Sequence, residues 1–319
     1  MVLCARLMYY PLFILSYLVS LLPLRLLYFF SDLVRLIIFH IVPYRKKLVM
    51  DHLALALPEK SEAERRRIAW MFYRNLVDYF METLKLVSSG RNYVARHFTI
   101  DNPSMYLDLL NQGKRVQLQV AHLFNWELAN NWIPYTMNHP FIVLYMPLSN
   151  NPMNRFFLYL RGKTGTTLVP ATDARKGMLA FRTRNYMLTL LADQAPGSPS
   201  NAYWLNFFGK PAGFVRAPER GARAGNTPVI FVKFYKTGRG KYRARLEKAS
   251  DQPEQLPEGE LTRRYVAFLE RSIREQPELY LWTHNRWKHS YKPEYGKFWI
   301  GDGEAPLNST EKKPDLRAE

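Results

Sequence analysis

The segment 115–127 reads Arg-Val-Gln-Leu-Gln-Val-Ala-His-Leu-Phe-Asn-Trp-Glu and decides the fold. Polar and apolar side chains alternate over 115–121, which is the period of a β-strand. Asn125 has the side chain of a helix N-cap, and a helix is predicted to follow it over 126–137. The segment therefore predicts a strand that delivers His122 to its carboxyl end, then a turn, then a helix.

Strand and helix signals alternate on both sides of this segment. Ser61 and Glu64 have the spacing of a capping box and predict a helix that Gly90 closes, and Asn102 and Asn151, each followed by proline, predict the starts of two more helices. Further strands are predicted over 141–146, 166–169, 186–192, 229–235 and 242–247, the last two as a hairpin around 238–240. This order predicts an α/β fold with a mixed central sheet flanked by helices.

The N-terminus carries the most apolar sequence of the chain. Residues 7–24 contain no charge, and this run of 18 is close to the roughly 20 residues that a spanning helix needs. Residues 26–42 are also apolar but include Asp32 and Arg35, which favour an interfacial helix. We therefore predict a membrane anchor and interfacial helix over 1–44, a catalytic domain over 45–300 and a disordered tail over 301–319. Two buried helices of a soluble core fit the same N-terminal sequence.

Composition limits the classes of function. The chain has 319 residues, with 45 Lys and Arg against 27 Asp and Glu, a formal charge of +18 that attracts nucleic acid, anionic lipid or an acidic carrier protein. The only cysteine is Cys4, so the sequence predicts neither a disulfide framework nor a thiolate zinc site. No glycine-rich phosphate loop and no nucleophile elbow occurs. We expect no metal or nucleotide cofactor.

His122 and Glu127 are the strongest candidate catalytic pair. With His122 at the end of the strand and Glu127 in the first helical turn, the carboxylate is expected to accept the proton on imidazole Nδ1. Nε2 is then free to take a proton from a substrate hydroxyl, as in a triad in which the substrate oxygen replaces serine. The same spacing also fits a structural histidine followed by a carboxylate that the helix dipole favours.

Four other residues are candidates for substrate binding. Asn125 lies where amides of the helix start could hold an oxyanion. Arg161 could bind a phosphate of the acceptor or of a phosphopantetheine arm, or could simply be solvated. Asp193 ends a strand, where α/β folds place their sites, but it could instead cap the turn that follows. Glu219 could bind the acceptor headgroup, or it could be a first-turn carboxylate after Pro218.

The motif from His122 to Glu127 resembles the His-x4-Asp/Glu motif of glycerolipid acyltransferases. The closer similarity is to the His-x-x-Asn-Trp-Glu form in the late acyltransferases of bacterial lipid A biosynthesis. Other similarities follow in the same order: Arg161 with Gly165, Gly177-Met178, Asp193-Gln194, Phe207-Phe208-Gly209, and Trp282-Thr-His284-Asn-Arg286-Trp287-Lys288. The chain departs from the family at Asn285, Trp287 and 195–196, and 217–219 is closer to the wider superfamily.

The resemblance implies a glycerolipid-acyltransferase-like fold and an O-acyltransferase. The expected donor is an acyl carrier protein or acyl-CoA, and the expected acceptor is a hydroxyl of a lipid A precursor. The resemblance also implies the bacterial inner membrane, with the catalytic domain facing the cytoplasm and the basic surface near anionic lipid. An aminolipid, glycolipid or phospholipid acceptor remains open, as does a basic membrane-surface protein without catalysis. Nucleic acid is disfavoured as a partner because no nucleic-acid-binding signature is visible.

Overall fold

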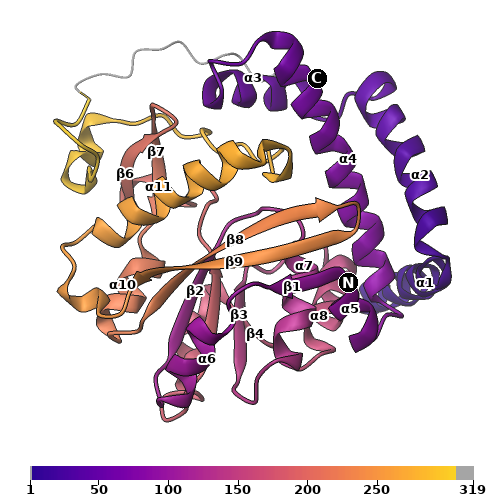
Figure 1. The fold of residues 1–319 in the computed structure, drawn as a ribbon, viewed down its shortest axis with the longest axis horizontal. Coiled ribbons are helices and arrows are strands. Elements are labelled where there is room, and N and C mark those ends of the chain that lie inside the picture. Colours follow the sequence, from indigo (N-terminus) through magenta and orange to yellow (C-terminus); the bar gives the residue numbers. More distant parts are fainter. Residues whose placement is uncertain (1, 307–319) are drawn as a thin grey trace.

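A seven-stranded mixed sheet forms the centre of the fold (Figure 1). The computed structural model describes residues 2–306, and side chains from residue 8 onward. The strand order is β1-β9-β8-β2-β5-β3-β4. The strands are β1 (Phe98–Ile100), β2 (Val116–Val120), β3 (Phe141–Tyr145), β4 (Thr167–Pro170), β5 (Met187–Leu191), β8 (Val229–Gly238) and β9 (Lys241–Ser250). β8, β2, β5, β3 and β4 are mutually parallel, whereas β9 is antiparallel to β8 and parallel to β1. The predicted mixed sheet is confirmed, and the predicted hairpin is the β8–β9 pair.

Strand β2 lies inside the sheet and is buried on both faces. All five of its residues are buried, although the alternation of glutamine and apolar residues would also suit a half-exposed strand. Gln117 is accommodated because its Nε2 donates to the carbonyl of Pro218 at 3.0 Å. A buried amide that keeps a hydrogen bond avoids most of its desolvation penalty.

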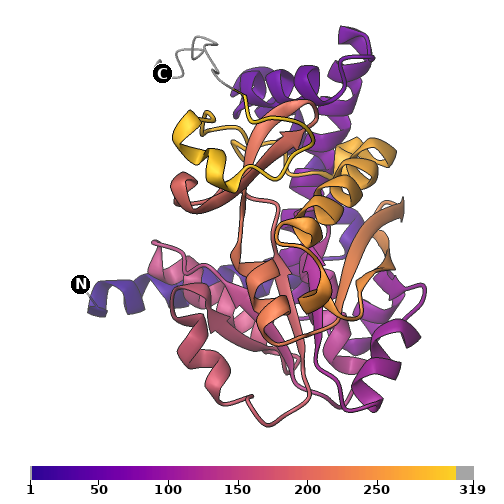
Figure 2. The same cartoon turned by 90° about the vertical axis from the view of Figure 1, so that its left-hand side faces the viewer.

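Helices cover both faces of the sheet. The helices after the N-terminal pair are α3 (Lys46–Ala56), α4 (Glu62–Leu86), α5 (Arg91–His97), α6 (Ser104–Asn111), α7 (Trp126–Trp132), α8 (Asn151–Gly162), α9 (Ala174–Leu179), α10 (Ala217–Ala224) and α11 (Glu260–Glu275). Short 3-10 helices occupy Ile133–Tyr135, Ala171–Asp173, Pro199–Asn201, Pro253–Gln255, Pro277–Leu279 and Pro293–Phe298. α6 and α11 lie on one face of the sheet, and α8 and α9 lie on the other (Figures 1 and 2).

The predicted start of α4 is confirmed. Ser61 N donates to Glu64 Oε2 at 2.8 Å, and Glu64 N donates to Ser61 Oγ at 3.3 Å, which completes the capping box. Its predicted end is wrong, because α4 ends at Leu86 and Gly90 has φ −107° and precedes α5. The backbone tightens there, with Val87 N donating to the carbonyl of Leu84, so the helix stops without a left-handed glycine.

Two other predicted helix boundaries change. Asn102 does not cap α6, because its side chain pairs with the backbone of Leu246 on β9 through two hydrogen bonds of 3.0 Å. This pairing ties the start of α6 to the sheet. Helix α7 ends at Trp132 and does not reach residue 137, since Pro134 supplies no amide proton for a continuing helix.

The structure has a second, two-stranded sheet that the sequence did not predict. β6 (Ala202–Phe207) pairs antiparallel with β7 (Lys210–Val215) around a two-residue turn at Phe208 and Gly209, both with positive φ. Positive φ at both turn residues is the geometry of a type I′ hairpin. Residues 301–304 form bends, residues 305 and 306 have no regular secondary structure, and the rest of the predicted tail, 307–319, lies outside the described residues.

The N-terminal segment folds as two helices and a short π-helix. α1 (Val2–Leu21) packs against α8 and α4, and α2 (Leu24–Leu36) lies along α4 before the π-helix Ile37–Ile41 (Figure 1). Within residues 2–306, no single helix is both long and apolar enough to cross a membrane. Met8–Leu21 and Leu24–Ile41 meet those criteria only as a pair, and they are bent by 115°. The membrane anchor remains a prediction.

The turn between β8 and β9 has a glycine that should not tolerate a side chain. Gly240 has φ +70°, and an added Cβ would collide with the hydroxyl of Tyr28 on α2. We predict that Gly240→Ala lowers the free energy of unfolding by about 1–2 kcal/mol or more. At Gly238 an added Cβ would lie 3.9 Å from the nearest atom, so Gly238→Ala should change it by less than about 0.5 kcal/mol. Unfolding in detergent measures both variants, and equal losses would contradict the prediction.

Candidate active site

The register of β2 and β5 brings His122 and Asp193 together. Val120 lies opposite Leu191 in the parallel pair, and Ala192 N donates to the carbonyl of Val120 at 3.1 Å. His122 and Asp193 each follow two residues after these partners, so both emerge at the carboxyl edge of the sheet. Sites in open α/β sheets form at this edge.

The carboxylate of Asp193 accepts two hydrogen bonds from His122, one from the imidazole ring and one from the backbone amide. Oδ1 lies 2.7 Å from His122 Nδ1, and Oδ2 accepts the backbone amide of His122 at 3.1 Å. Burial raises the pKa of Asp193, but the positive charge and hydrogen bonds of His122 outweigh it and leave the pKa below its usual value. A carboxylate at Nδ1 assigns the proton to that nitrogen and leaves Nε2 as an acceptor. Nε2 lies 3.2 Å from Nε2 of Gln194, which can then donate to it.

The expected contact between Glu127 and His122 Nδ1 is wrong. Glu127 is fully buried at the start of α7, and its carboxylate points to Arg161 on α8. Tyr79 Oη on α4 donates to it at 3.3 Å, and Trp126 Nε1 donates at 3.1 Å. Glu127 turns away because the first turn of α7 directs its side chain toward α4 and α8, whereas β5 supplies the carboxylate for His122.

Arg161 and Glu127 form a forked ion pair. Arg161 Nε lies 3.0 Å and 3.1 Å from the two carboxylate oxygens, and Nη2 lies 2.5 Å from Oε1. Burial lowers the pKa of Arg161, but the charge and hydrogen bonds of Glu127 outweigh it, so the pKa lies above its usual value. The edge of the guanidinium that carries Nε and Nη2 already faces the carboxylate of Glu127. The phosphate-binding role of Arg161 stays a prediction.

Asn125 caps α7, as the sequence predicts. Its Oδ1 accepts the amides of Glu127 at 3.1 Å and Leu128 at 3.2 Å, and its Nδ2 donates to Glu82 on α4 at 2.8 Å. Because this cap already occupies the backbone amides of Glu127 and Leu128, the remaining candidate donors to an oxyanion are the backbone amides of Asn125 and Trp126. The ring of Trp126 packs edge-on against His122 at a centroid distance of 5.1 Å.

Glu219 caps a different helix. Its carboxylate is 1% exposed and accepts hydrogen bonds from Gly259 N at 2.5 Å, Thr262 N at 2.9 Å and Thr262 Oγ1 at 2.6 Å. These contacts anchor the start of α11 to α10. The predicted role in binding an acceptor headgroup has no support from this geometry.

The C-terminal segment holds the turn that follows β2, residues 122–125, in place through hydrogen bonds. Leu281 N donates to the carbonyl of His122 at 3.1 Å, and Phe124 N donates to the carbonyl of Leu279 at 3.1 Å. His284 Nε2 accepts the amide of Ala195 at 3.0 Å, just beyond Gln194. The sequence did not predict the contact between residues 284 and 195, although His284 lies in one segment that resembles the lipid A acyltransferases and Ala195 directly follows another, Asp193-Gln194. Among residues 2–306, no cluster of three or more His, Cys, Asp or Glu side chains could hold a metal ion.

Comparison with known proteins places this site in a family. Residues 5–289 match the family model for bacterial lipid A biosynthesis acyltransferases. The chain belongs to this acyltransferase family. It is also 25% identical over 247 residues to the lipid A biosynthesis lauroyltransferase of Escherichia coli (strain K12), covering 76% of this chain and 79% of that protein. The resemblance seen in the His122–Glu127 motif is thereby confirmed, and the family gives the geometry a reaction class, acyl transfer in lipid A biosynthesis.

Two histidines, the buried His52 and the half-buried His284, should make stability depend on pH. Burial lowers the pKa of His284 and of His52 to about 4, from a usual value of 6.5. Because the unfolded chain binds these protons more tightly, their contribution is present above pH 6.5 and is lost as pH falls toward 4. We predict that the free energy of unfolding falls over this window and that His284→Gln flattens the fall. Denaturant unfolding across the window checks this, and an unchanged slope in the variant would contradict it.

Proposed function

We propose that this enzyme transfers a fatty acyl chain from an acyl thioester to a hydroxyl of a lipid A precursor, with His122 as general base. The observation that carries the proposal is the hydrogen bond between His122 Nδ1 and the buried carboxylate of Asp193. It orients the ring and makes Nε2 a proton acceptor at the carboxyl edge of the sheet, where the acceptor hydroxyl would take the place of the Gln194 amide. An imidazole fixed in this way is suited to take a proton from a hydroxyl through Nε2.

The proposed reaction is direct transfer. The acceptor hydroxyl gives its proton to His122 Nε2 as its oxygen attacks the thioester carbonyl carbon. Asp193 stabilises the imidazolium that forms, and the amides of Asn125 and Trp126 are the candidate donors to the oxyanion. The carbon–sulfur bond then breaks, and the imidazolium returns the proton to the leaving thiolate. The products are an ester and a free thiol, and no other reactant is needed.

We assign Glu127 and Arg161 to the support of the catalytic turn. Their ion pair joins the start of α7 to α8 behind the His122 segment. Removing the charge of Glu127 would leave the Arg161 guanidinium without its carboxylate partner in a largely buried place. Loss of either group is therefore expected to affect activity through the shape of the turn.

An acyl carrier protein is the proposed donor, with acyl-CoA as the alternative. The formal charge of +18 favours an acidic carrier, and high salt should weaken that attraction. A lipid A precursor is the proposed acceptor because the family acts in lipid A biosynthesis. An aminolipid, glycolipid or phospholipid acceptor is the second candidate, since the chain departs from the family at Asn285, Trp287 and 195–196.

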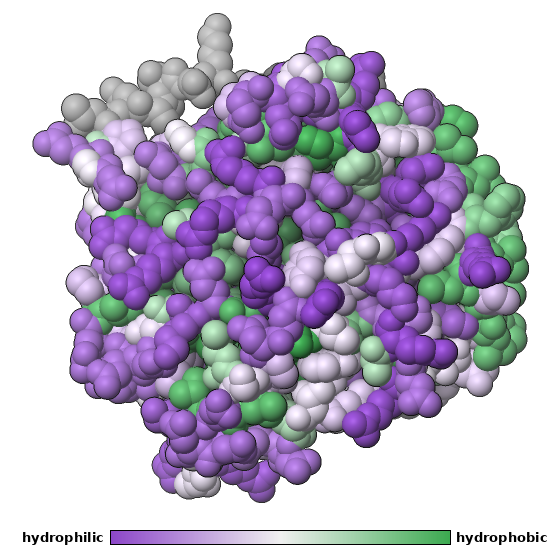
Figure 3. All heavy atoms as spheres, in the orientation of Figure 1, coloured by the Kyte–Doolittle hydropathy of each residue, from purple (hydrophilic) through white to green (hydrophobic). Residues whose placement is uncertain are grey.

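The N-terminal helices supply a surface for membrane contact, which we call the N-terminal apolar surface. It comprises Tyr10, Ile14, Leu15 and Leu18 on α1, Phe29, Phe30, Leu33 and Leu36 on α2, and Ile41 and Val42 beyond them. Phe29 is 64% exposed and Ile41 is 74% exposed, and Figure 3 shows apolar residues along this side of the molecule. A contiguous exposed apolar surface marks an interaction site. We propose that it binds the inner membrane, with the catalytic domain on the cytoplasmic side.

Substitutions at His122 and Asp193 should separate chemistry from folding. We predict that His122→Ala lowers kcat by on the order of 10²-fold or more. Asp193→Asn should lower kcat by a similar or smaller factor, because the carboxylate acts only through His122, and the amide keeps one hydrogen bond but loses the charge that stabilises the imidazolium. Both variants should keep KM near its wild-type value. The rate of acyl transfer from an acylated acyl carrier protein to a lipid A precursor measures both effects. Turnover by His122→Ala at a tenth of the wild-type rate or more would contradict the assignment of the base.

Charge placed on the N-terminal apolar surface should weaken membrane binding. We predict that the double variant Phe29→Glu and Leu33→Glu partitions poorly onto anionic phospholipid vesicles in flotation experiments. Arg66→Glu is the matched control, because it changes the net charge by the same two units at an exposed site on α4, outside this surface. Equal partitioning of the double variant and the wild type at high salt would exclude this surface as the contact.

A further inference from the structure

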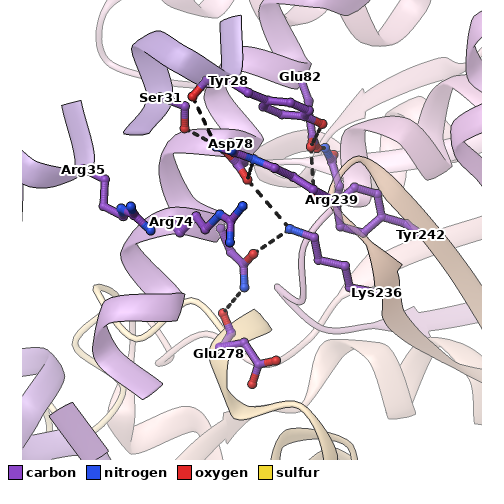
Figure 4. Close-up of polar contacts among 12 residues, drawn as sticks. Tyr28, Ser31, Arg35, Arg74, Asp78, Glu82, Lys236, Arg239, Tyr242 and Glu278 are labelled. Carbon is purple, nitrogen blue, oxygen red and sulfur yellow. Dashed lines mark hydrogen bonds and ion pairs between the residues drawn. The ribbon is translucent and has the colours of Figure 1, made fainter. Parts of the chain in front are cut away.

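A buried carboxylate, Glu82, lies near the C-terminal end of α4, between α2 and the turn that follows His122. It is 0% exposed. Tyr28 Oη on α2 donates to its Oε1 at 2.8 Å, and Tyr242 Oη on β9 donates to the same oxygen at 3.2 Å (Figure 4). Its other oxygen, Oε2, accepts Nδ2 of Asn125 at 2.8 Å. Glu82 thus joins α2, the sheet and the cap of α7.

A neighbouring ion-pair cluster fixes α2 in place. Arg239, in the turn between β8 and β9, contacts Asp78 on α4 at 2.6 Å and Asp32 on α2 at 2.8 Å. Ser31 Oγ donates to Asp78 Oδ1 at 2.6 Å, and Lys236 Nζ lies 3.8 Å from Asp78 (Figure 4). The inner side of α2 is therefore held by charged and polar contacts, while its outer side is apolar. Tyr28 meets Glu82 because this cluster sets the position of α2.

Glu82 acts as an acceptor for all three of these contacts. A protonated carboxyl would have to donate one hydrogen bond, whereas an ionised one can accept all three. Burial raises the pKa of Glu82 above its usual value, although the charge of Lys236 and the hydrogen bonds from Tyr28 and Asn125 act in the opposite direction. The charged or titratable groups that face it are Tyr28 of α2, Asp78 of α4, Tyr93 of α5, Lys236 of β8 and Tyr242 of β9. Because Glu82 is buried, water cannot easily replace any of the three hydrogen bonds that its carboxylate accepts.

The contact with Glu82 decides which way the Asn125 amide faces. Asn125 has one acceptor and one donor group, and only its Oδ1 can cap the amides of Glu127 and Leu128. A carboxylate at Nδ2 favours this orientation, since the flipped amide would bring two oxygens together. Asn125 lies three residues after His122, and its own amide is a candidate oxyanion donor. The orientation of this one side chain therefore shapes the turn that carries the chemistry.

From these contacts we infer that Glu82 is a positioning residue for acyl transfer, acting through Asn125, with Tyr28 and Tyr242 holding Glu82. This inference rests on the proposed function. It also makes α2 part of the catalytic apparatus, because Tyr28 comes from the same helix that carries the N-terminal apolar surface. Glu82 touches no reacting atom, so its loss should lower kcat and leave KM nearly unchanged.

An exchange of donor and acceptor tests this inference in the full-length enzyme. Aspartate is as good an N-cap as asparagine, so Asn125→Asp alone keeps an oxygen that can cap the helix. It also sets a second carboxylate against Glu82, and the repulsion between the two should draw the cap away from the amides of Glu127 and Leu128. We expect kcat per folded molecule to fall about 10-fold or more, and to fall further as the pH rises and the proton shared by the two carboxyls is lost. Adding Glu82→Gln restores the pairing, because the introduced amide can donate through its nitrogen to the aspartate while its oxygen accepts both tyrosines. The double variant should recover to within about 3-fold of Glu82→Gln alone.

Tyr93→Phe is the matched control for Tyr28→Phe. The Tyr93 hydroxyl is buried near Glu82 but has no hydrogen-bond partner among the described residues. Its removal should leave kcat unchanged, whereas Tyr28→Phe should lower kcat several-fold. Equal effects of these two variants would overturn the inference, as would wild-type turnover in Asn125→Asp or a double variant no better than Asn125→Asp.

Hydrogen exchange at the start of α7 tests the positioning without any substrate. In Asn125→Asp the peptide that contains the amides of Glu127 and Leu128 should exchange faster, and in the double variant its protection should return. Unchanged exchange would overturn the inference even if acyl transfer is confirmed. If the wild type fails to acylate a lipid A precursor, the proposed function fails, and the exchange pattern still decides whether Glu82 sets the turn.

Discussion

The parallel pairing of β2 with β5 is the constraint on which the active site depends. Their register sets Val120 opposite Leu191, and the side chains of His122 and Asp193 each follow two residues after these partners. A shift of one residue would turn Asp193 to the opposite side of the sheet, because side chains alternate along a strand. Burial of β2 on both faces makes such a shift costly, since five buried residues would lose their places together. Sheet packing thus sets the geometry of the His122–Asp193 pair.

Buried charges hold the elements around this pair. Glu127 with Arg161 joins α7 to α8, and Asp78 with Arg239 joins α4 to the β8–β9 turn. Such pairs add little net stability over well-packed apolar residues, but the loss of one partner leaves an expensive buried charge. Their effect is therefore to make alternative arrangements of these elements unfavourable. A catalytic turn needs this kind of restriction, because small displacements of a base reduce the rate strongly.

The two sides of α2 meet different surroundings. The inner side of α2 meets Asp78, Glu82 and Arg239 through polar groups, whereas the outer side exposes phenylalanine and leucine. This division explains why Asp32 and Arg35 occur in an otherwise apolar segment. Asp32 pairs with Arg239, and the guanidinium of Arg35 packs on Trp70 at 4.0 Å. Polar residues that are costly within a bilayer are here used to attach a helix to the protein.

The amino-acid sequence by itself determined the local structure. The alternation in 115–121 predicted the strand, Ser61 with Glu64 predicted the start of α4, and Asn125 predicted the cap of α7, because these signals act between residues close in the chain. The motif also indicated the family and identified His122 as the candidate base. Tertiary structure alone decided which carboxylate meets His122. Asp193 is distant in sequence and adjacent only through the β2–β5 pairing, whereas Glu127 is near in sequence but is turned toward Arg161 by the first turn of α7. Spacing along the chain determines where side chains point only within one helix or strand. Which residues of different elements come into contact is set by how the strands pair and the helices pack.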